Sequence, residues 1–289
     1  MKKIIAFCCC FIYYHCNAQN LDSLLNSITE EEPSYISATF KASRIINTQS
    51  VEQLKSNHLD FRIHHRFGQI NSGAYNFWGL DNGSIFMSLE YGIKDWFTVG
   101  MGRASQDKTF NGFGKFKLLR QATGTKACPV SISLYTGADL YTIERKDVPI
   151  ENINRLSYIF QLLIARKFSE SFSLQITPTL IHSNLVVTKQ DYNDLFALNA
   201  GGRLKLTRRI SFNAEYNYAF QPNYAGYTNK PNGLSLGFDI ETGGHIFQLM
   251  LSNTTGMIER HFINNNLGKW SDGNIVLGFN ISRTFSFNQ

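Results

Sequence analysis

Hydrophobic and polar side chains alternate along most of this chain. The segment LDFRIHHRFG, residues 59–68, shows the pattern clearly. Leu59 and Phe61 begin an apolar series at every second position, and Asp60 and Arg62 begin a charged or imidazole series at the positions between. Only in a β-strand do successive side chains point to opposite faces, so a period of two predicts a strand between two different environments.

The same alternation recurs to the C-terminus and predicts an all-β chain. With weaker members at 96–104 and 113–121, we count about 12 strands, many of them near the 9–11 residues that a tilted strand needs to cross a bilayer. The clearest further runs are GSIFMSLEYGI (83–93), PVSISLYTGADLY (129–141), RLSYIFQLLIARK (155–167), FSLQITPTL (172–180), FALNAGGRLKL (196–206), ISFNAEYNY (210–218), GLSLGFDIE (233–241), HIFQLMLSN (245–253) and NIVLGFNISRTF (274–285).

The connections between these runs alternate between short and long. A tight turn at one end of every strand pair and a long loop at the other is typical of an up-and-down antiparallel meander. The link at 121–129 is intermediate. The short links are 94–95, 169–171, 208–209 and 242–244, and the long ones are 68–83, 105–112, 142–153, 182–193, 219–232 and 253–272.

The N-terminus has the pattern of a secretory signal peptide. Lys2 and Lys3 precede an apolar stretch at 4–14, and Cys16-Asn17-Ala18 places small residues at a cleavage site. We therefore expect residues 1–18 to be removed and the mature chain to start at Gln19. Lipoprotein processing at Cys16 is the alternative, but the residues before it are bulky.

Two all-β architectures fit the alternation: a soluble sandwich and a transmembrane barrel. The sandwich buries its apolar faces together, whereas the barrel turns them to lipid. The export signal, the long strands and the aromatic residues at strand ends favour the barrel. Such aromatics on the apolar positions are Phe67, Tyr91, Phe97, Tyr158, Phe172 and Tyr218, and the C-terminus adds Phe285 and Phe287.

Charge and cysteine content narrow the function classes. The 28 basic and 22 acidic residues give a net charge of +6, which falls to +4 once Lys2 and Lys3 are removed. Basic residues do not cluster beyond pairs, so we expect no nucleic-acid partner. Four of the five cysteines lie in the signal peptide, so the mature chain keeps only Cys128 and cannot form an internal disulfide.

Several segments resemble a known family. These are ATFKASRIINTQSVE (38–52), LDFRIHHRFG, residues 74–105 and FNGFGKFKLLRQ (110–121). They resemble a Bacteroidota family of β-barrel outer-membrane proteins without an assigned function. The resemblance is strongest over residues 37–121 and extends loosely to the C-terminus. It implies an outer-membrane location and a barrel fold. A barrel in that location has membrane lipids as partners. Many outer-membrane barrels also end on a terminal Phe that the assembly machinery reads, and we expect the same partner here, although Asn288 and Gln289 follow Phe287. The resemblance implies no site residues.

The charged side chains on the polar positions are the candidates for the inner face of a barrel. An Arg or Lys facing lipid at the bilayer midplane costs about 2–4 kcal/mol, which explains the segregation. These charges could form a selective constriction, or they could pair with one another and close the lumen. The lumen-lining candidates are Asp60, Arg62, His64, Arg66, Glu90, Lys115, Lys117, Asp139, Arg155, Arg203, Lys205, Glu215, Asp239 and Glu241.

We divide the chain into residues 1–18, the signal peptide, residues 19–55, an N-terminal segment, and residues 56–289, the barrel. Residues 39–47 alternate weakly and could add a strand, but one extra strand would spoil an even count. We therefore expect residues 19–55 to lie in the lumen or to cover its periplasmic mouth. A segment in the lumen would make the protein gated or closed.

Enzymatic and metal sites find little support in the sequence. His64 and His65 are adjacent, so in a strand they point to opposite faces and cannot share one metal ion. We expect no metal and no cofactor. His65 and His245 fall on the lipid-facing positions, where an outer-membrane lipid hydrolase would need them, but there is no GxSxG elbow. The sequence favours a passive channel or a binding protein for a small solute. The alternative is a non-transporting structural or surface-scaffold barrel, with a lipid hydrolase as the most distant option.

Overall fold

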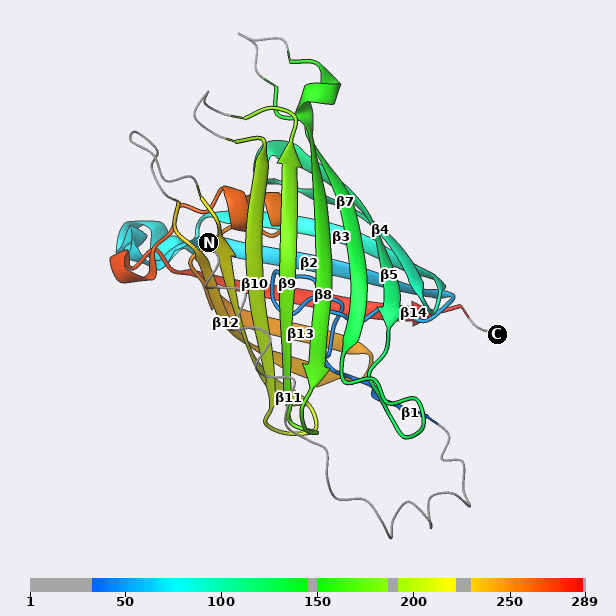
Figure 1. Ribbon diagram of the computed structural model, residues 1–289. Coiled ribbons are helices and arrows are strands. Elements are labelled where there is room, and N and C mark those ends of the chain that lie inside the picture. The colour runs from blue at the N-terminus through cyan, green and yellow to red at the C-terminus, as the bar shows by residue number, and fades with distance from the viewer. Residues whose placement is uncertain (1–32, 145–149, 187–191, 222–229, 288–289) are drawn as a thin grey trace, which may run out of the picture.

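Twelve antiparallel strands close into a barrel (Figure 1). The computed structural model describes residues 33–144, 150–186, 192–221 and 230–287. The predicted signal peptide lies outside them. The barrel strands are β2 (His58–Gln69), β3 (Gly83–Lys94), β4 (Phe97–Ala104), β5 (Thr109–Leu119), β7 (Ser131–Tyr141), β8 (Leu156–Lys167), β9 (Phe172–Ser183), β10 (Asp194–Lys205), β11 (Ile210–Ala219), β12 (Gly233–Thr242), β13 (His245–Ser252) and β14 (Val276–Ser286).

The barrel is an up-and-down meander, as the sequence predicts. Each strand pairs with its neighbours along the chain, and β14 pairs with β2 to close the ring, from Val276 opposite Gln69 to Ser286 opposite His58. Closure gives every strand two partners, so no unpaired strand edge is left to face hydrocarbon.

The two ends of the barrel differ in their connections. One end, here called the tight-turn end, carries the links β3–β4, β8–β9, β10–β11 and β12–β13, and the opposite loop end carries the long links. Between β12 and β13, Thr242 pairs with His245, so Gly243 and Gly244 alone form the turn, at φ +44° and +103°. A two-residue turn with positive φ at both positions suits glycine and matches the twist of the strands.

Side chains alternate between the inside and the outside of the barrel. In β2, the Phe61 side chain is 38% exposed and the adjacent Arg62 only 2%. In β13, Leu249 is 50% exposed on the outer face, and its neighbour Gln248 is buried. The apolar series therefore forms the outer surface and the polar series the interior, which is the arrangement expected of a transmembrane barrel rather than of a sandwich.

One strand starts earlier than the sequence indicates. The alternation predicts a link at 105–112 and a strand from 113, but β5 begins at Thr109, which pairs with Tyr141. Gly112 and Gly114 occupy outward positions of this strand, so the side chains that would have shown the alternation are missing there. The boundary was wrong because glycine leaves no pattern.

The remaining described elements are short. A two-stranded sheet of β1 (Ser34–Tyr35) and β6 (Ala122–Thr123) lies outside the barrel, beside the tight-turn end (Figure 1). Within the described residues, no helix is long and apolar enough to cross a membrane. Five short 3-10 turns and one π-helical turn lie between strands: η1 (Ile70–Ser72), η2 (Ala74–Gly79), η3 (Gln106–Lys108), η4 (Asn152–Arg155), the π-helical η5 (Arg260–Asn264) and η6 (Trp270–Asp272).

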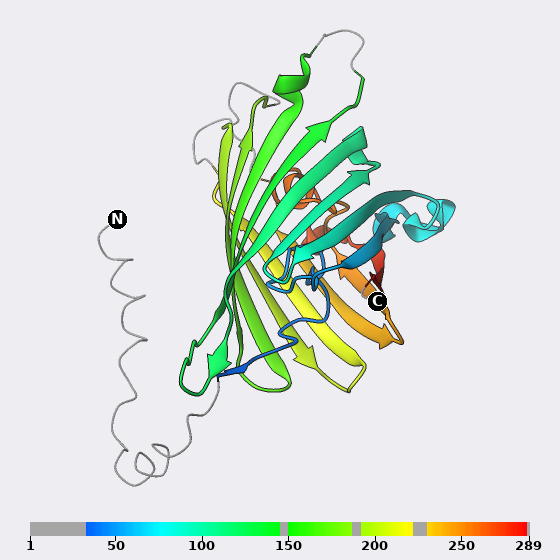
Figure 2. The same cartoon turned by 90° about the vertical axis from the view of Figure 1, so that its right-hand side faces the viewer.

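The chain between β1 and β2 enters the barrel. Residues 38–54, here called the inner segment, add no strand to the ring, and Figure 2 shows this blue part of the chain running up inside the strands. Within it, Arg44 and Gln49 form an isolated bridge, and the Ile45 amide donates to the Thr48 carbonyl at 2.9 Å. In the described part of residues 19–55, residues 38–54 lie inside the ring and form none of its strands; residues 19–32 lie outside the described residues.

Candidate functional site: the filled lumen

Most of the predicted lumen-lining side chains are buried inside the barrel. Ten of the fourteen are no more than 4% exposed, and Arg44 of the inner segment and Glu259 of the loop after β13 are buried as well. The interior therefore holds charges of both signs in similar number, and Asp60 and Arg62 form an ion pair at 2.9 Å. The ten are Asp60, Arg62, His64, Arg66, Glu90, Lys115, Asp139, Arg203, Glu215 and Asp239.

The other four candidates lie nearer the barrel ends and are only half-buried. Arg155 lies in η4, before β8 begins, and donates to the carbonyls of Ile143 and Ile150, so it belongs to the loops rather than to the lumen wall. The chain turns at η4, where alternation no longer sets direction. At the tight-turn end are Lys117, Lys205 and Glu241, the last paired with Lys41 of the inner segment.

Glu215 holds the tip of the inner segment. Its carboxylate, on β11, accepts the backbone N–H groups of Ile46, Asn47 and Thr48 at 3.0–3.2 Å. Glu215 is 2% exposed. Consecutive amides converging on one carboxylate form charge-assisted hydrogen bonds, which are about twice as strong as neutral ones. A single wall residue thus satisfies three amides that have no strand partner.

Lys115 binds carbonyl groups of the inner segment, as Glu215 binds its amides. Its ammonium group, on β5, donates to the carbonyl oxygens of Ser43, Ser50 and Glu52 at 3.2, 3.2 and 2.9 Å. The two arms of the inner segment are joined to each other at this level, where the Ser50 amide donates to the Ser43 carbonyl at 2.8 Å. One cation and one anion from opposite parts of the wall therefore fix both ends of the turn.

Further side chains of the wall, most of them neutral amides, complete the contacts with the inner segment. Gln175 on β9 accepts the Val51 amide at 2.8 Å and donates to the Gln49 carbonyl at 2.7 Å. These contacts surround the segment on all sides, and each joins a side chain to the segment's backbone. The others are Gln248 to Ile45, Asn280 to Ile46, Ser133 to Val51 and Arg203 to Ala38 and Thr39.

Gly201 leaves room for the inner segment. A Cβ atom at this position of β10 would lie 2.4 Å from Cδ1 of Ile45. Real Cβ atoms essentially never come that close to another heavy atom, so a side chain here requires the Ile45 side chain to shift. Gly201 thus permits the close approach of the Ile45 side chain to the backbone of β10.

A second segment fills the loop end. Residues 253–266, here called the loop segment, leave β13 and fold inward around the π-helical turn η5. Phe262 is fully buried in a cluster with wall residues that include Tyr135, Ile159 and Leu163. Met257 and Ile258 pack with Phe86 and Ala104. The loop segment is therefore held by apolar packing, in contrast to the polar attachment of the inner segment.

The buried ionisable groups of the loop segment have shifted pKa values. Burial raises the pKa of Glu259, although Arg44 opposes the shift. Burial lowers the pKa of His261 below its usual value of 6.5, and the nearby Asp107 carboxylate counteracts this. His261 Nε2 lies 3.4 Å from Asp107 Oδ2. The neutral imidazole is therefore the favoured form of His261 in the buried loop segment.

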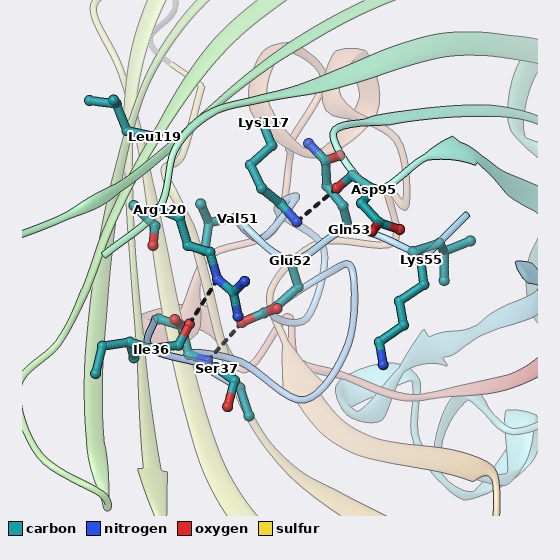
Figure 3. A pocket seen from close by; sticks show the side chains of 14 residues that line it. Ile36, Ser37, Val51, Glu52, Gln53, Lys55, Asp95, Lys117, Leu119 and Arg120 are labelled. Atoms are coloured by element: carbon teal, nitrogen blue, oxygen red, sulfur yellow. Dashed lines mark hydrogen bonds between the residues drawn. The ribbon is translucent and has the colours of Figure 1, made fainter. Parts of the chain in front are cut away.

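Two small cavities flank the inner segment at the tight-turn end. One has a volume of about 230 Å³ and lies between the segment and β5, where Arg120 lies beside Glu52 and Lys117 donates to the Asp95 carbonyl (Figure 3). In this view the Arg120 guanidinium donates to the Ile36 carbonyl, and Glu52 accepts the Thr39 amide. The other, of about 240 Å³, is lined by residues that include Lys41, Asp60 and Arg62. Both cavities include Glu52, Gln53 and Leu54 in their walls.

The histidines considered for lipid hydrolysis lie among aromatic side chains. His65 stacks on Phe279 with ring centroids 5.1 Å apart and meets Phe67 edge-on at 4.5 Å, and His245 stacks on Phe247 at 6.1 Å. Among the described residues, no group of three or more metal-ligating side chains comes together.

Sequence reasoning missed part of the interior. Only charged residues were singled out, so the amides of Gln175, Gln248 and Asn280 were overlooked, although all three lie at polar positions of the alternation. Glu259 was missed because it lies in a loop, where no period shows that a side chain points inward.

Comparison with known proteins identifies the family. The model of a family described as "Membrane bound beta barrel domain (DUF5777)" matches residues 40–285. The chain belongs to this family. Together with the apolar outer face, membership makes the chain an outer-membrane-type β-barrel. The family's own description gives no activity, and the match includes most of the inner segment.

Solved structures similar to this family member include outer-membrane channels. The "KdgM porin" has 7% identity and a TM-score of 0.47, over 80% of this chain and 99% of that chain. The COG4313 outer membrane channel from Pseudomonas putida F1 has 11% identity and a TM-score of 0.47, over 81% and 97%. The "CymD monoaromatic hydrocarbon channel" has 11% identity and a TM-score of 0.40, over 82% and 90%. No curated protein matches the chain.

Proposed function

We propose that this barrel is a passive, gated channel for small polar solutes, and that the inner segment closes it at rest. The observation that carries the proposal is the polar attachment of that segment. Glu215, Lys115 and Gln175 bind its backbone, and water can replace such contacts when the segment moves. Exchange of protein hydrogen bonds for water costs little net free energy, typically about 0.5–1.5 kcal/mol for each bond.

The wall itself supports a passage. Its inward positions hold small polar residues such as Ser133, Ser157 and Ser211, which do not fill the interior by themselves. The space is filled by two segments that belong to no barrel strand. Once the inner segment is displaced, the exposed wall would carry acidic and basic groups together, among them Arg62, Glu90 and Glu215, which suits small polar solutes better than apolar ones.

Conductance across planar bilayers tests the proposal. The wild-type barrel is expected to be closed most of the time. The double variant Glu215→Ala/Lys115→Met is expected to open at least roughly a hundredfold more often, because three amides and three carbonyls of the segment lose their wall partners. Ser157→Ala is the matched control, since Ser157 bonds Ser183 on the wall and not the inner segment.

The alternative is a non-transporting structural or surface-scaffold barrel. One observation favours it: the loop after β2 exposes large aromatic side chains, with Tyr75 96% exposed, Phe77 54% and Trp78 53%. Exposed apolar groups of this kind often mark interaction surfaces. Silence of the double variant at every voltage, in barrels that remain folded and resistant to detergent, would reject the channel and favour the scaffold.

We also propose that the barrel is not an enzyme, since the aromatic surroundings of His65 and His245 give neither ring an evident nucleophile to activate. Phospholipid hydrolysis by the purified protein, lost in His65→Ala or His245→Ala, would overturn this. Cleavage after residue 18, recognition of the C-terminal Phe285 and Phe287 by the assembly machinery, and Bacteroidota origin are further proposals. They rest on the sequence pattern and the resemblance described above, and the apparent mass of the mature protein would test the first.

A further inference from the structure

The inner segment and the loop segment meet in the middle of the barrel. The inner segment enters from the tight-turn end and the loop segment from the loop end, and Arg44 of the first faces Glu259 of the second. Arg44 Nη1 lies 3.5 Å from Glu259 Oε1, and both side chains are fully buried. The same nitrogen donates to the Asn47 carbonyl at 2.7 Å and to the Met257 carbonyl at 3.4 Å.

This contact differs from the rest of the attachment of either segment. The inner segment is bound to the wall mainly by hydrogen bonds to its backbone, and the loop segment mainly by apolar packing around Phe262. Arg44 also lies over the Phe86 ring at 5.7 Å, and Phe86 is part of the cluster that holds Met257 and Ile258. Lys115 and Gln49 are further neighbours of the Glu259 carboxylate. Arg44 thus reaches from the inner segment into the packing of the loop segment.

A buried ion pair makes each partner dependent on the other. If the inner segment left alone, Glu259 would remain buried without its main counter-charge. If the loop segment left alone, Arg44 would lose its ion-pair partner and keep only the wall carboxylates Glu90 and Asp139, neither of which pairs with it directly. Removal of one partner from a buried pair is far more costly than removal of both, because it leaves an uncompensated charge in a medium of low dielectric. The interior therefore disfavours states in which only one segment is displaced.

We propose that the Arg44–Glu259 ion pair couples the two segments, so that the barrel opens from both ends together. Either segment alone closes one half of the lumen. With the ion pair intact, the two segments move as a single gate. A solute therefore enters either half of the lumen only when both segments are released. This inference concerns the regulation of the proposed channel and rests on that function for its role, but the coupling itself is a property of the closed barrel.

Hydrogen exchange followed by mass spectrometry on the full-length mature barrel in detergent tests the coupling without any need for conductance. The decisive variant is Glu259→Gln. Glu259 belongs to the loop segment, so an effect on residues 42–52 must pass across the interface. We expect exchange to rise in both segments, by roughly a hundredfold. The charge-reversed pair Arg44→Glu/Glu259→Arg should bring exchange in both segments back toward the wild-type rate.

Lys41→Gln provides the matched control. Lys41 pairs with Glu241 on the wall, so this variant also removes an ion pair of the inner segment, but one that does not involve the loop segment. This pair is partly exposed and contributes little, so its loss should speed exchange only around residue 41 and leave residues 44–50 and 253–266 unchanged. If Glu259→Gln does not fold, Glu259→Asp, which keeps the charge and shortens its reach, replaces it with the same expected direction.

The outcomes separate the coupling from the channel. Faster exchange confined to residues 253–266 in Glu259→Gln would overturn the coupling, whether or not the barrel conducts. Faster exchange in both segments, with restoration by the charge-reversed pair, supports it even if every variant is silent in bilayers. In that case the channel fails and the coupling remains.

Discussion

Replacement of Glu215 by alanine is the most informative single change in the wall. The Glu215 carboxylate lies on β11 and accepts three consecutive amides of the inner segment. Alanine removes both acceptor oxygens. It should leave β11 intact, because the strand already contains alanine at position 214 and its outward side chains do not change. The wall side of the contact then offers no acceptor to Ile46, Asn47 or Thr48.

The expected effect follows from the number of amides. A buried amide left without an acceptor costs about 1–3 kcal/mol, and water entering the space left by the side chain favours the lower figure. Three amides at about 1 kcal/mol each lower the free energy of displacing the inner segment by about 3 kcal/mol. At about 1.4 kcal/mol per factor of ten, the displaced state becomes roughly a hundredfold more populated. Glu215→Gln keeps one acceptor oxygen and should give a smaller effect.

Amide exchange of residues 46–48 in the folded barrel measures this directly. Exchange there should rise by roughly a hundredfold in Glu215→Ala and by less in Glu215→Gln, while strands such as β8 exchange as in the wild type. Unchanged exchange at residues 46–48 in both variants would show that the carboxylate does not hold the segment. A uniform increase over the whole barrel would show instead that the variant destabilises the fold.

Three further predictions concern other parts of the molecule. The pKa of His261, measured by NMR titration, should lie below 6.5, because burial favours the neutral imidazole. The buried position of the loop segment is therefore favoured above pH 6.5 and loses this contribution as the pH falls through the folded-state pKa. Asp107→Asn should lower the pKa of His261 further, and a pKa at or above 6.5 would contradict the buried position. Gly201→Ala should lower the free energy of displacing the inner segment by about 1 kcal/mol, because its Cβ clashes with Ile45 Cδ1, and amide exchange of residues 46–48 measures this. Ile45→Val lacks the Cδ1 atom and should relieve the clash. Independent, additive effects of the two changes would contradict the contact. Leu249→Arg, on the outer face near mid-wall, should destabilise the barrel in lipid vesicles by about 2–4 kcal/mol in urea titrations, and a neutral result would place this face away from hydrocarbon.

The barrel could be predicted from the sequence because two solvents impose a strict period of two. At Phe61 and Arg62, or Leu249 and Gln248, adjacent residues face hydrocarbon and a polar interior, and neither tolerates the other's environment. The glycine turn at 243–244 and the other short links predicted which strands are antiparallel neighbours, because a tight turn joins only adjacent strands. Where glycine replaced the informative side chain, as in β5, the boundary was misjudged.

The interior could be predicted only in part. Alternation places Glu215 and Lys115 on the inner face, but it does not show what they contact, because their partners are backbone groups more than 60 residues away in sequence. Ile45, Arg44 and Glu259 lie in segments without a period, and their positions depend on the tertiary packing of the closed barrel. The mixed charges were compatible with a selective constriction and with a closed lumen, and the inner segment lies inside the barrel among them.

The reactivity of a single cysteine at position 48 tests the closed lumen most directly. In a Cys128→Ser background, Thr48→Cys replaces a side chain that is 2% exposed at the tip of the inner segment, and Tyr75→Cys replaces one that is 96% exposed on a surface loop. With a water-soluble maleimide and the folded barrel, we expect labelling at position 48 to be slower than at position 75 by roughly a hundredfold, as for a site reached only through an opening of about 3 kcal/mol. Equal labelling rates at the two positions would show that residues 38–54 do not fill the barrel.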